Sequence, residues 1–581
     1  MRKPFFDTRI VKSTLWTVLC VGRIIAIIAF AGTTGIGMAA ENSESVEGFL
    51  KTYVGKEDPS YEWSIKQDTK TEKIRFVLVE LTSQTWLTPK EVNRTDWRHW
   101  LEIYIPNDRE SDVPLLFISG GSNAGEEPQR SNSVGQQIAL VSKTIVAQLS
   151  QVPNQPLVFL GDGVERSEDN LISFSWIQYL NSGRLEWLAQ AAMVKSASRA
   201  MDAVIEVLAT DDMGPIDVGK FVVAGGSKRG WTTWLTAVVD ARVVAIVPVV
   251  FDVLNMRKSM KHHFGAYGFW SVSLGDYVNQ GILRQFDSEK LSPILQVVDP
   301  FHYLSELDIP KFVVNATGDE FFLLDSSQFY WNEMLNPKYL RYVPNADHGL
   351  SGSDALQSVA SFVSLAAQNK PIPSIEWNRT SSNRIEIRTS IEPIQTMVWE
   401  AHSPVSRDFR LLRGPDGSPR GPVFSSRPLT SHSEDLLSFE ASVDMPHSGW
   451  TAWFVEFAFD VGLDVPLKMS TDVQVLPIDL PFAAEDFTQD TFLTIHCLRN
   501  HDDDQTPDNV LEFIEETTGS PKINHKFFSN RDYYTWKQSG DLLVEGTAVS
   551  RFLNFMGYEE CHYQLESGEG PTMPPLLKVE D

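Results

Sequence analysis

Three residues that together could hydrolyse an ester or an amide occur in order along the chain: Ser227, Asp319 and His348. A serine hydroxyl becomes a nucleophile when a histidine accepts its proton, and a carboxylate holds that histidine in the correct tautomer. Each of the three follows a predicted β-strand, where the catalytic groups of a parallel sheet are expected. We therefore predict a catalytic triad of nucleophile, acid and base, in that order, and expect neither a metal nor a cofactor.

The serine lies in Gly225-Gly226-Ser227-Lys228-Arg229-Gly230, between a predicted strand over Phe221–Ala224 and a helix that begins near Arg229. A nucleophile elbow needs small neighbours because its serine occupies a strained turn. The usual pattern G-x-S-x-G would place its second glycine at position 229, whereas here the glycine comes one residue later. The order of the three catalytic residues is nevertheless that of an α/β-hydrolase.

An oxyanion hole requires two backbone N–H groups beside the nucleophile. One is expected from Lys228, because it follows the serine at the start of a helix. The other is expected from Gly121 or Ser122, in the loop after the apolar strand Leu115–Ile118. The alternative for this loop is an ordinary strand-to-helix turn.

Two assignments have rivals in the sequence. Asp325 is a second candidate for the acid that orients the histidine. Arg229 is predicted to bind a carboxylate or phosphate of the substrate, since a guanidinium pairs with such groups in a bidentate manner. The alternative is a structural role, in which Arg229 and Lys228 pair with acidic neighbours such as Glu165 or Asp169.

Short apolar strands alternate with amphipathic helices up to about residue 368, which predicts a mostly parallel sheet covered on both faces. The expected strands are Arg75–Leu81, Leu101–Ile105, Leu115–Ile118, Leu157–Leu160, Phe221–Ala224, Val243–Phe251, Lys311–Asn315 and Leu340–Pro344, and the expected helices include Val134–Leu149 and Gln190–Leu208. The aromatic-rich residues 252–308 interrupt this rhythm. They predict a helical cap insertion or, alternatively, packing against the flank of the sheet.

The apolar period changes to two after Pro371, as in Trp453, Val455, Phe457 and Phe459. Such alternation between turn clusters predicts a β-sandwich-like domain over residues 371–480. The α/β-hydrolase domain would then occupy residues 41–370. Residues 481–581 are expected to form an acidic C-terminal α+β extension, with a short helix over Val510–Glu516.

Residues 1–40 have the order of a secretory signal peptide: basic residues, the apolar run Ile24–Gly32, then small residues up to Ala40. Arg23 interrupts the longer apolar stretch, which argues against an unbroken membrane span. We therefore expect a secreted or periplasmic protein without a stable membrane span after signal cleavage. The alternative is an uncleaved N-terminus that anchors the protein in a membrane.

The composition excludes several other classes of protein. A net charge of −26 repels phosphate backbones, so nucleic acid is not an expected partner. With Cys20 in the signal, only Cys497 and Cys561 remain, and they either form one disulfide or stay as buried thiols. Too few cysteines remain for a zinc site built from thiolates. The run Asp502–Asp504 lacks the glycine of a calcium loop and is predicted to be a solvated acidic loop.

With these residues identified, the chain resembles the PhoPQ-activated pathogenicity-related protein family, which includes the secreted autocrine proliferation repressor of slime moulds. The matching stretches are Leu81–Trp86, Gln151–Pro156, Arg166–Asp169, Ser227–Trp234, Asp252–Asn255, His262-His263, Thr317–Phe322 and Tyr339–His348. The likeness covers about residues 55–480 and agrees with the late glycine of the elbow. It implies an exported α/β-hydrolase-like protein followed by a β-domain, but it does not supply a substrate.

Two functions from different classes follow. The first is a secreted serine hydrolase that cleaves an ester, an amide or a peptide. The second is a secreted signalling or binding protein on a hydrolase scaffold, with a partner at the cell surface, because a fold does not fix a function. An intact triad favours the first, and the acidic extension leaves room for the second.

Overall fold

The computed structural model describes residues 46–483 except for 126, 129–132, 211, 213, 414–418 and 433, together with the strand segments 491–499, 523–528, 531–537 and 558–567. The predicted signal peptide, the predicted helix Val510–Glu516 and the acidic run Asp502–Asp504 lie outside the described residues. Among the described residues, no helix combines the length and the apolar character needed to cross a membrane.

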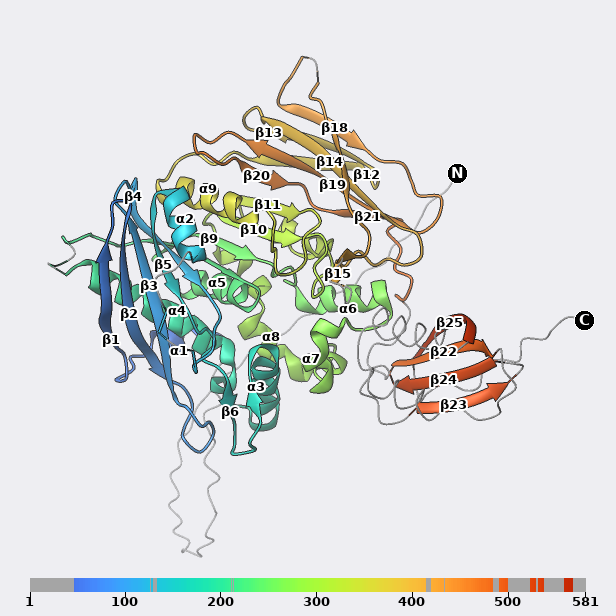
Figure 1. Cartoon of the computed structure of the whole chain (residues 1–581), viewed down its shortest axis with the longest axis horizontal. Helices are drawn as coiled ribbons and strands as arrows, with labels where there is room; N and C mark the ends of the chain where they lie inside the picture. The colour runs from blue at the N-terminus through green and yellow to red at the C-terminus, as the bar shows by residue number, and fades with distance from the viewer. Residues whose placement is uncertain are drawn as a thin grey trace, which may run out of the picture. The chain divides into compact units, whose positions relative to one another are not determined.

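In the described part of the chain, nine strands form a central sheet in the order β1-β2-β3-β5-β4-β8-β9-β10-β11 (Figure 1). Their bounds are β1 Glu62–Lys70, β2 Ile74–Thr85, β3 Asp96–Pro106, β4 Ser111–Ile118, β5 Thr144–Leu149, β8 Phe221–Gly226, β9 Val243–Val249, β10 Lys311–Ala316 and β11 Lys338–Val343. The first three strands are antiparallel to their neighbours, and every pairing from β5 to β11 is parallel. The predicted, mostly parallel sheet is thus confirmed.

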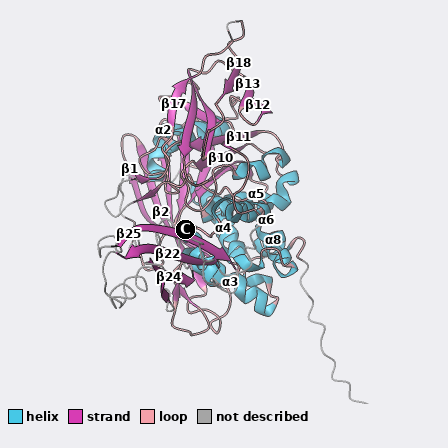
Figure 2. Ribbon diagram, turned by 90° about the vertical axis from the view of Figure 1, so that its right-hand side faces the viewer, coloured by secondary structure: helices cyan, strands magenta, loops and turns pink. Residues whose placement is uncertain are grey.

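Helices cover both faces of this sheet (Figures 1 and 2). Their bounds are α1 Phe49–Gly55, α2 Val134–Ser142, α3 Glu168–Ser182, α4 Ala189–Leu208, α5 Lys228–Val239 and α9 Ala355–Ala367. Side chains from α1, α3, α4 and α5 share one hydrophobic core, whereas α2 and α9 contribute to a second core on the opposite face. The strands are therefore apolar on both sides, which explains their short, uninterrupted apolar runs.

Two predicted elements are wrong. The helix expected over Val134–Leu149 ends at Ser142, where Lys143 adopts a left-handed conformation (φ 51°), and the strand β5 follows at once. The β-branched residues Thr144, Ile145 and Val146 favour an extended chain, so the helical spacing of the apolar residues does not continue as a helix beyond Ser142. The strand expected at Leu157–Leu160 is only the two-residue β6 Leu157–Val158, paired with β7 Glu165–Arg166 outside the central sheet.

Residues 252–308 contain helices, as predicted for the cap insertion. They are α6 Met256–Tyr267, α7 Gly275–Asn279 and α8 Ser292–Val298, joined by 3-10 turns. The cap starts immediately after β9 and returns to the sheet at β10. It therefore lies in the connection between two neighbouring strands, beyond the carboxyl end of the first of them.

Antiparallel strands follow the last helix, as the two-residue period predicts. Their bounds are β12 Ile375–Ser381, β13 Arg384–Thr389, β14 Gln395–Ser403, β15 Leu412–Arg413, β16 Pro419–Arg420, β17 Ser425–Pro428, β18 Ser438–Ser442, β19 Trp450–Phe459, β20 Leu467–Ser470 and β21 Gln474–Leu476. Apart from β15 and β16, which pair with each other, they form one sheet ordered β12-β13-β18 and another ordered β17-β14-β19-β20, with β21 also paired to β19. The second sheet contacts the hydrolase part directly, since the N–H of Tyr342 in β11 donates to Ser470 Oγ in β20 at 2.8 Å.

The described strands of the C-terminal extension form one antiparallel sheet in the order β23-β24-β22-β25. Their bounds are β22 Thr491–Arg499, β23 Ile523–Phe528, β24 Arg531–Lys537 and β25 Tyr558–Ser567. In the β22–β25 pair, His496 lies opposite His562 and Leu498 lies opposite Glu559, with a register shift between them. Cys497 and Cys561 therefore lie in neighbouring strands at this irregularity.

Candidate active site at the carboxyl ends of the strands

Ser227 occupies a strained turn between β8 and α5. Its backbone has φ 55° and ψ −124°, a conformation that L-residues adopt only when the surrounding structure holds it. A Cβ atom added at Gly225 would lie 2.6 Å from the Arg229 carbonyl oxygen, and one at Gly230 would lie 2.9 Å from the Val249 carbonyl oxygen. The late glycine is thus required because the first turn of α5 passes close to the end of β9.

The predicted acid and base lie on neighbouring loops and contact each other. Asp319 Oδ2 and His348 Nδ1 are 2.8 Å apart, and both side chains are largely buried. Asp319 Oδ1 accepts the backbone N–H groups of Phe321 and Phe322 at 2.7 and 3.2 Å. These two bonds fix the carboxylate, which in turn orients the imidazole, as the triad requires.

The loop that carries Asp319 is held from both sides. The N–H of Gly318 donates to the Ala346 carbonyl of the His348 loop at 2.9 Å. The N–H of Leu411, from the segment before β15, donates to the Gly318 carbonyl at 2.9 Å, and a Cβ added at Gly318 would lie only 2.4 Å from Leu411 Cβ. Glycine is therefore the residue that lets the segment after β14 approach the acid.

His348 is prepared to act as a base. Burial disfavours the charged imidazolium, but the charge and hydrogen bond of Asp319 outweigh this effect and raise the pKa of His348 above 6.5. Its Nε2 atom is buried and makes no hydrogen bond within the described residues, so the bond between Ser227 and His348 is not formed in this structure. A serine hydroxyl reorients by rotation about χ1, and catalytic hydrogen bonds commonly form only when the substrate is bound.

The rival acid, Asp325, is committed to a different cluster. Its carboxylate pairs with His262 Nε2 at 2.9 Å and with the Arg407 guanidinium at 2.6 Å. Burial would raise the pKa of Asp325, but the Arg407 guanidinium and the hydrogen-bonded His262 keep it far below the ordinary value. The structure thus pairs Asp319, and not Asp325, with His348.

The oxyanion-hole residues are only partly brought together. Lys228 is the first residue of α5, so its N–H belongs to the first helical turn, where intrahelical acceptors are missing. Gly120 lies against the Arg229 guanidinium, which places the loop after β4 beside the elbow. Gly121 has φ 136° and lies next to Gln151. The roles of Gly121 and Ser122 remain a prediction.

The two basic residues after the serine form ion pairs with the start of α3. The Arg229 guanidinium forms two hydrogen bonds with the Glu168 carboxylate, at 2.8 and 2.6 Å, and a third with the Val152 carbonyl. Lys228 Nζ lies 2.6 Å from Asp169 Oδ2. Arg229 is buried, and its donors already have acceptors within the protein. This geometry favours the structural alternative, with Glu168 in place of the expected Glu165.

A narrow, partly open apolar cavity of about 60 Å³ adjoins Ser227. Its lining comes from the elbow, from α3, from the loop after Asp319 and from the cap: Asp169, Trp176, Ser227, Lys228, Trp231, Phe251, Val253, Met256, Met260, Leu274, Tyr277, Leu283, Phe286, Phe321 and Phe322. Residues of the segment 252–308 thus contribute to this lining, and its assignment as a cap stays a prediction. Phe321 and Phe322 also contact the His348 ring, with centroids 4.4 and 5.9 Å away, so two residues of the lining also border His348.

Sequence reasoning missed a buried carboxylate at the end of β9. Asp252 accepts hydrogen bonds from the hydroxyls of Tyr330 and Tyr342, both at 2.6 Å. Burial is the main cause that raises the pKa of Asp252 to about 7. The stretch Asp252–Asn255 is distinctive in the sequence, but its tyrosine partners lie far along the chain and gave no local signal.

A second serine–histidine pair lies inside the sheet. Ser83 Oγ in β2 is 2.9 Å from His99 Nε2 in β3, and His99 Nδ1 lies 3.0 Å from the Ser150 carbonyl. Both side chains are fully buried, and burial lowers the pKa of His99 to about 4. Ser83 also hydrogen-bonds Ser196 of α4, so the pair joins a strand to a helix.

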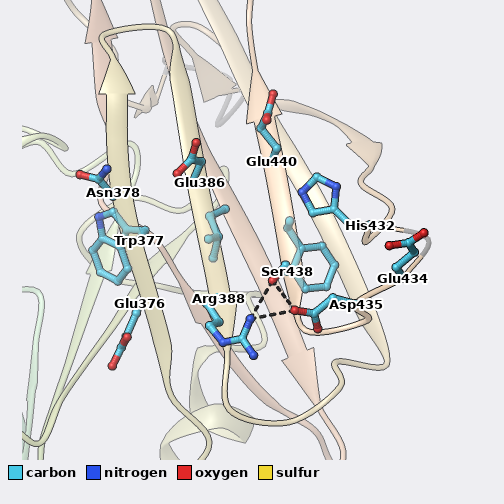
Figure 3. Close-up of a pocket in the computed structure, with 12 residues that line it drawn as sticks. Glu376, Trp377, Asn378, Glu386, Arg388, His432, Glu434, Asp435, Ser438 and Glu440 are labelled. Atoms are coloured by element: carbon cyan, nitrogen blue, oxygen red, sulfur yellow. Dashed lines mark hydrogen bonds and ion pairs between the residues drawn. The ribbon is translucent and has the colours of Figure 1, made fainter.

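A wide, open hollow lies on the outer face of β12, β13 and β18 (Figure 3). Glu386 and Glu440 lie opposite each other in the β13–β18 register. Arg388 pairs with Asp435 at 2.8 Å, and both hydrogen-bond Ser438. Acidic side chains dominate this face, and none of the described residues forms a group suited to hold a metal ion.

The strand order and the interleaved helices define the α/β-hydrolase fold, and Ser227, Asp319 and His348 follow β8, β10 and β11, the order typical of that fold. The chain belongs to the PhoPQ-activated pathogenicity-related protein family, whose model matches residues 50–410. It is 35% identical over 458 residues to autocrine proliferation repressor protein A of Dictyostelium discoideum, covering 75% of this chain and 92% of that protein.

Solved esterases share only part of the structure. An acetyl xylan esterase from Paenibacillus sp. R4 aligns with a TM-score of 0.35 at 15% identity, covering 52% of this chain and 86% of the esterase. Acetyl xylan esterase 1 from a Thermoanaerobacterium species aligns with a TM-score of 0.38 at 13% identity, covering 56% and 94% of the two chains.

Proposed function

We propose that this protein is a secreted serine hydrolase that cleaves an ester or an amide. The observation that carries the proposal is the hydrogen bond between Asp319 and His348, whose ring contacts Phe321 of the cavity lining that also contains the strained Ser227. The proposal is supported by the positions of the three predicted residues, which follow β8, β10 and β11 at the carboxyl ends of these parallel strands. A structural serine would not require the strained turn or the close-fitting glycines around it.

In the proposed reaction, Ser227 Oγ attacks the substrate carbonyl carbon while His348 Nε2 accepts the serine proton. The new bond between oxygen and carbon forms a tetrahedral oxyanion, for which the N–H of Lys228 is the first expected donor. The bond from this carbon to the leaving group then breaks, and His348 returns the proton to that group. Water hydrolyses the acyl-enzyme by the same steps, which releases an acid and restores Ser227.

A second candidate is a secreted protein that binds a partner at the cell surface, with the hydrolase site secondary. Two observations favour it: His348 Nε2 lacks a hydrogen bond, and a related protein is named for repressing proliferation. The acidic hollow on β12, β13 and β18 would offer a separate surface for such a partner. The two candidates differ in whether Ser227 is reactive.

Labelling with a fluorophosphonate probe distinguishes them, since this reagent modifies only an activated serine. The intact protein is expected to be labelled, and Ser227→Ala is expected to abolish both labelling and esterase activity. Ser83→Ala is the matched control, because it removes a serine that also contacts a histidine. Labelling that persists in Ser227→Ala, or that disappears only in Ser83→Ala, would contradict the proposed function.

A further inference from the structure

The cavity beside Ser227 has a continuous aromatic wall. Trp176 packs edge-on against Trp231 at 6.0 Å, and Trp231 stacks on Phe251 at 5.1 Å. Phe251 meets Phe322 edge-on at 5.9 Å, and Phe322 contacts the ring of His348. This wall connects the interior beneath the cap with the catalytic base.

The polar side chains of the lining already satisfy one another. Asp169 Oδ2 lies 2.6 Å from Lys228 Nζ, and Asp169 Oδ1 accepts the Tyr277 hydroxyl at 3.0 Å. Both carboxylate oxygens are thus engaged, and the one ammonium group of the lining has its counter-ion. A charged substrate group entering here would lose its hydration without gaining a free partner, which carries a large energetic cost.

The cap supplies part of the wall of this partly open cavity. Met260, Leu283 and Phe286 line it from α6 and the 3-10 region after α7, and all three are buried. The two parts of a cleaved ester leave the enzyme at different times. The leaving group must depart before water can attack, whereas the acyl group remains attached to Ser227 until water releases it. The apolar cavity next to Ser227 is therefore suited to the acyl group, and the leaving group would face solvent.

We infer that the substrate is an ester whose acyl part is a neutral, unbranched apolar chain, held in this cavity beneath the cap. The inference rests on the proposed function, because it requires an acyl group bonded to Ser227. It adds a substrate class that neither the triad nor the family relationship specifies. It also assigns a binding role to the cap residues Met260, Leu283 and Phe286.

The first test uses the wild-type protein and p-nitrophenyl esters that share one leaving group but carry acyl chains of two to sixteen carbons. Each methylene that enters the cavity should raise kcat/KM by about threefold to fourfold, until the chain exceeds the available space. A half-succinate ester, which carries a terminal carboxylate, should react at least tenfold more slowly than the butyrate ester. The reverse series, acetate esters of longer alcohols, should show little dependence on length.

The second test uses matched variants within the cap. Leu283→Ala lengthens the cavity and should shift the preferred acyl chain upward by two or more carbons. Leu291→Ala is the control, because Leu291 is equally buried in the cap but does not line the cavity. Phe286→Ala should shift the preference in the same direction if Leu283→Ala does not fold.

The outcomes separate this inference from the proposed function. Ser227-dependent hydrolysis with a flat chain-length profile, or with equal shifts in the Leu283 and Leu291 variants, would overturn the inference and leave the hydrolase assignment standing. Length dependence in the alcohol series alone would also overturn it. Hydrolysis that survives Ser227→Ala would overturn the proposed function first, and the inference with it.

Discussion

The molecule has two candidate combinations of a serine and a histidine, one inside the central sheet and one beyond its carboxyl edge, and their surroundings differ. Ser83 and His99 form a good hydrogen bond, yet they are sealed in the core, and a backbone carbonyl holds the ring. Ser227 and His348 do not touch in this structure, but they lie at the carboxyl ends of β8 and β11 beside a cavity. Contact between the two residue types is thus a poor guide to function.

The histidine pKa values make the difference explicit. Burial lowers the pKa of His99 to about 4, which keeps its ring neutral and unable to accept a proton at physiological pH. Burial disfavours the imidazolium of His348, but the carboxylate of Asp319 outweighs this effect and raises the pKa of His348, which would stabilise the imidazolium in the proposed acyl transfer. The acid next to His348 and the cavity next to Ser227 are why we propose this combination as the catalytic one.

Replacing each of the two histidines should give the largest difference between the two sites. His348→Gln is expected to lower kcat/KM by about 10⁴-fold or more while leaving thermal stability nearly unchanged, because triad members act as a unit. His99→Gln should lower the melting temperature, since a buried hydrogen-bonded side chain is disturbed, but the folded fraction should retain its activity. The folded fraction of each variant, measured by circular dichroism, gives the rate per folded molecule. Comparable losses per folded molecule would contradict the distinction.

Asp319→Asn tests the carboxylate that the internal pair lacks. We expect kcat to fall by about 10³- to 10⁴-fold, because an amide cannot stabilise the imidazolium in the same way. The backbone bonds from Phe321 and Phe322 can still reach the side-chain oxygen, so the loop should keep its shape. Asp325→Asn is the comparison, and it should reduce stability more than kcat. The opposite pattern would make Asp325 the catalytic acid.

The pH dependence sharpens the same comparison with a smaller effect. Only neutral His348 can accept the serine proton, and its raised pKa means that kcat/KM should climb with pH through a midpoint above 6.5. His99, with a pKa of about 4, should contribute no step between pH 5 and 8. A single acidic limb measured from pH 5 to 9 is the expected result. A midpoint clearly below 6.5 would show that the Asp319 interaction does not govern the base.

Arg229→Gln gives the smallest expected effect and tests whether this residue contacts substrate. Its pair with Glu168 holds the pKa of that carboxyl at about 2, although burial opposes this. A depressed carboxyl pKa contributes stability above its ordinary pKa of 4.5, and this contribution is lost as the pH falls towards 2. The variant should therefore lose about 1 kcal/mol of unfolding free energy at pH 7 and less at pH 3, since Glu168 is partly exposed.

The kinetics of the same variant complete the test. Neutral and anionic esters should lose activity equally, because the guanidinium is directed at Glu168 and the Val152 carbonyl. A selective loss of tenfold or more for anionic esters would restore the substrate-binding role. Lys228→Gln serves as a control at the other ion pair of the elbow.

The positions of Ser227, Asp319 and His348 after β8, β10 and β11 were predictable because each of these strands has a clear apolar signature, and their catalytic roles stay a prediction. The division of Val134–Leu149 into the helix α2 and the strand β5 was not predictable. The chain turns at Lys143, and the apolar residues on both sides of it are compatible with a helix or a strand. The sequence predicted only one of the two acidic partners of Lys228 and Arg229 correctly, because the start of α3 lies some 60 residues before the elbow. The sequence predicted a cap over residues 252–308. It could not predict the aromatic wall of the cavity, because residues far apart in the chain form that wall.

The bond between Leu411 and Gly318 has a consequence for how this protein can be divided. The change of period after Pro371 suggests a natural place to cut the gene, and a fragment ending there would keep all three catalytic residues. It would lose the support against which the acid loop rests, together with the Arg407 partner of Asp325. The family match extends to residue 410, just short of this contact. Recombination that exchanged the β-domain would therefore have to keep residues 407–411 with the part of the chain that contains the central sheet. The unit that can be exchanged thus ends after residue 411 and not at Pro371.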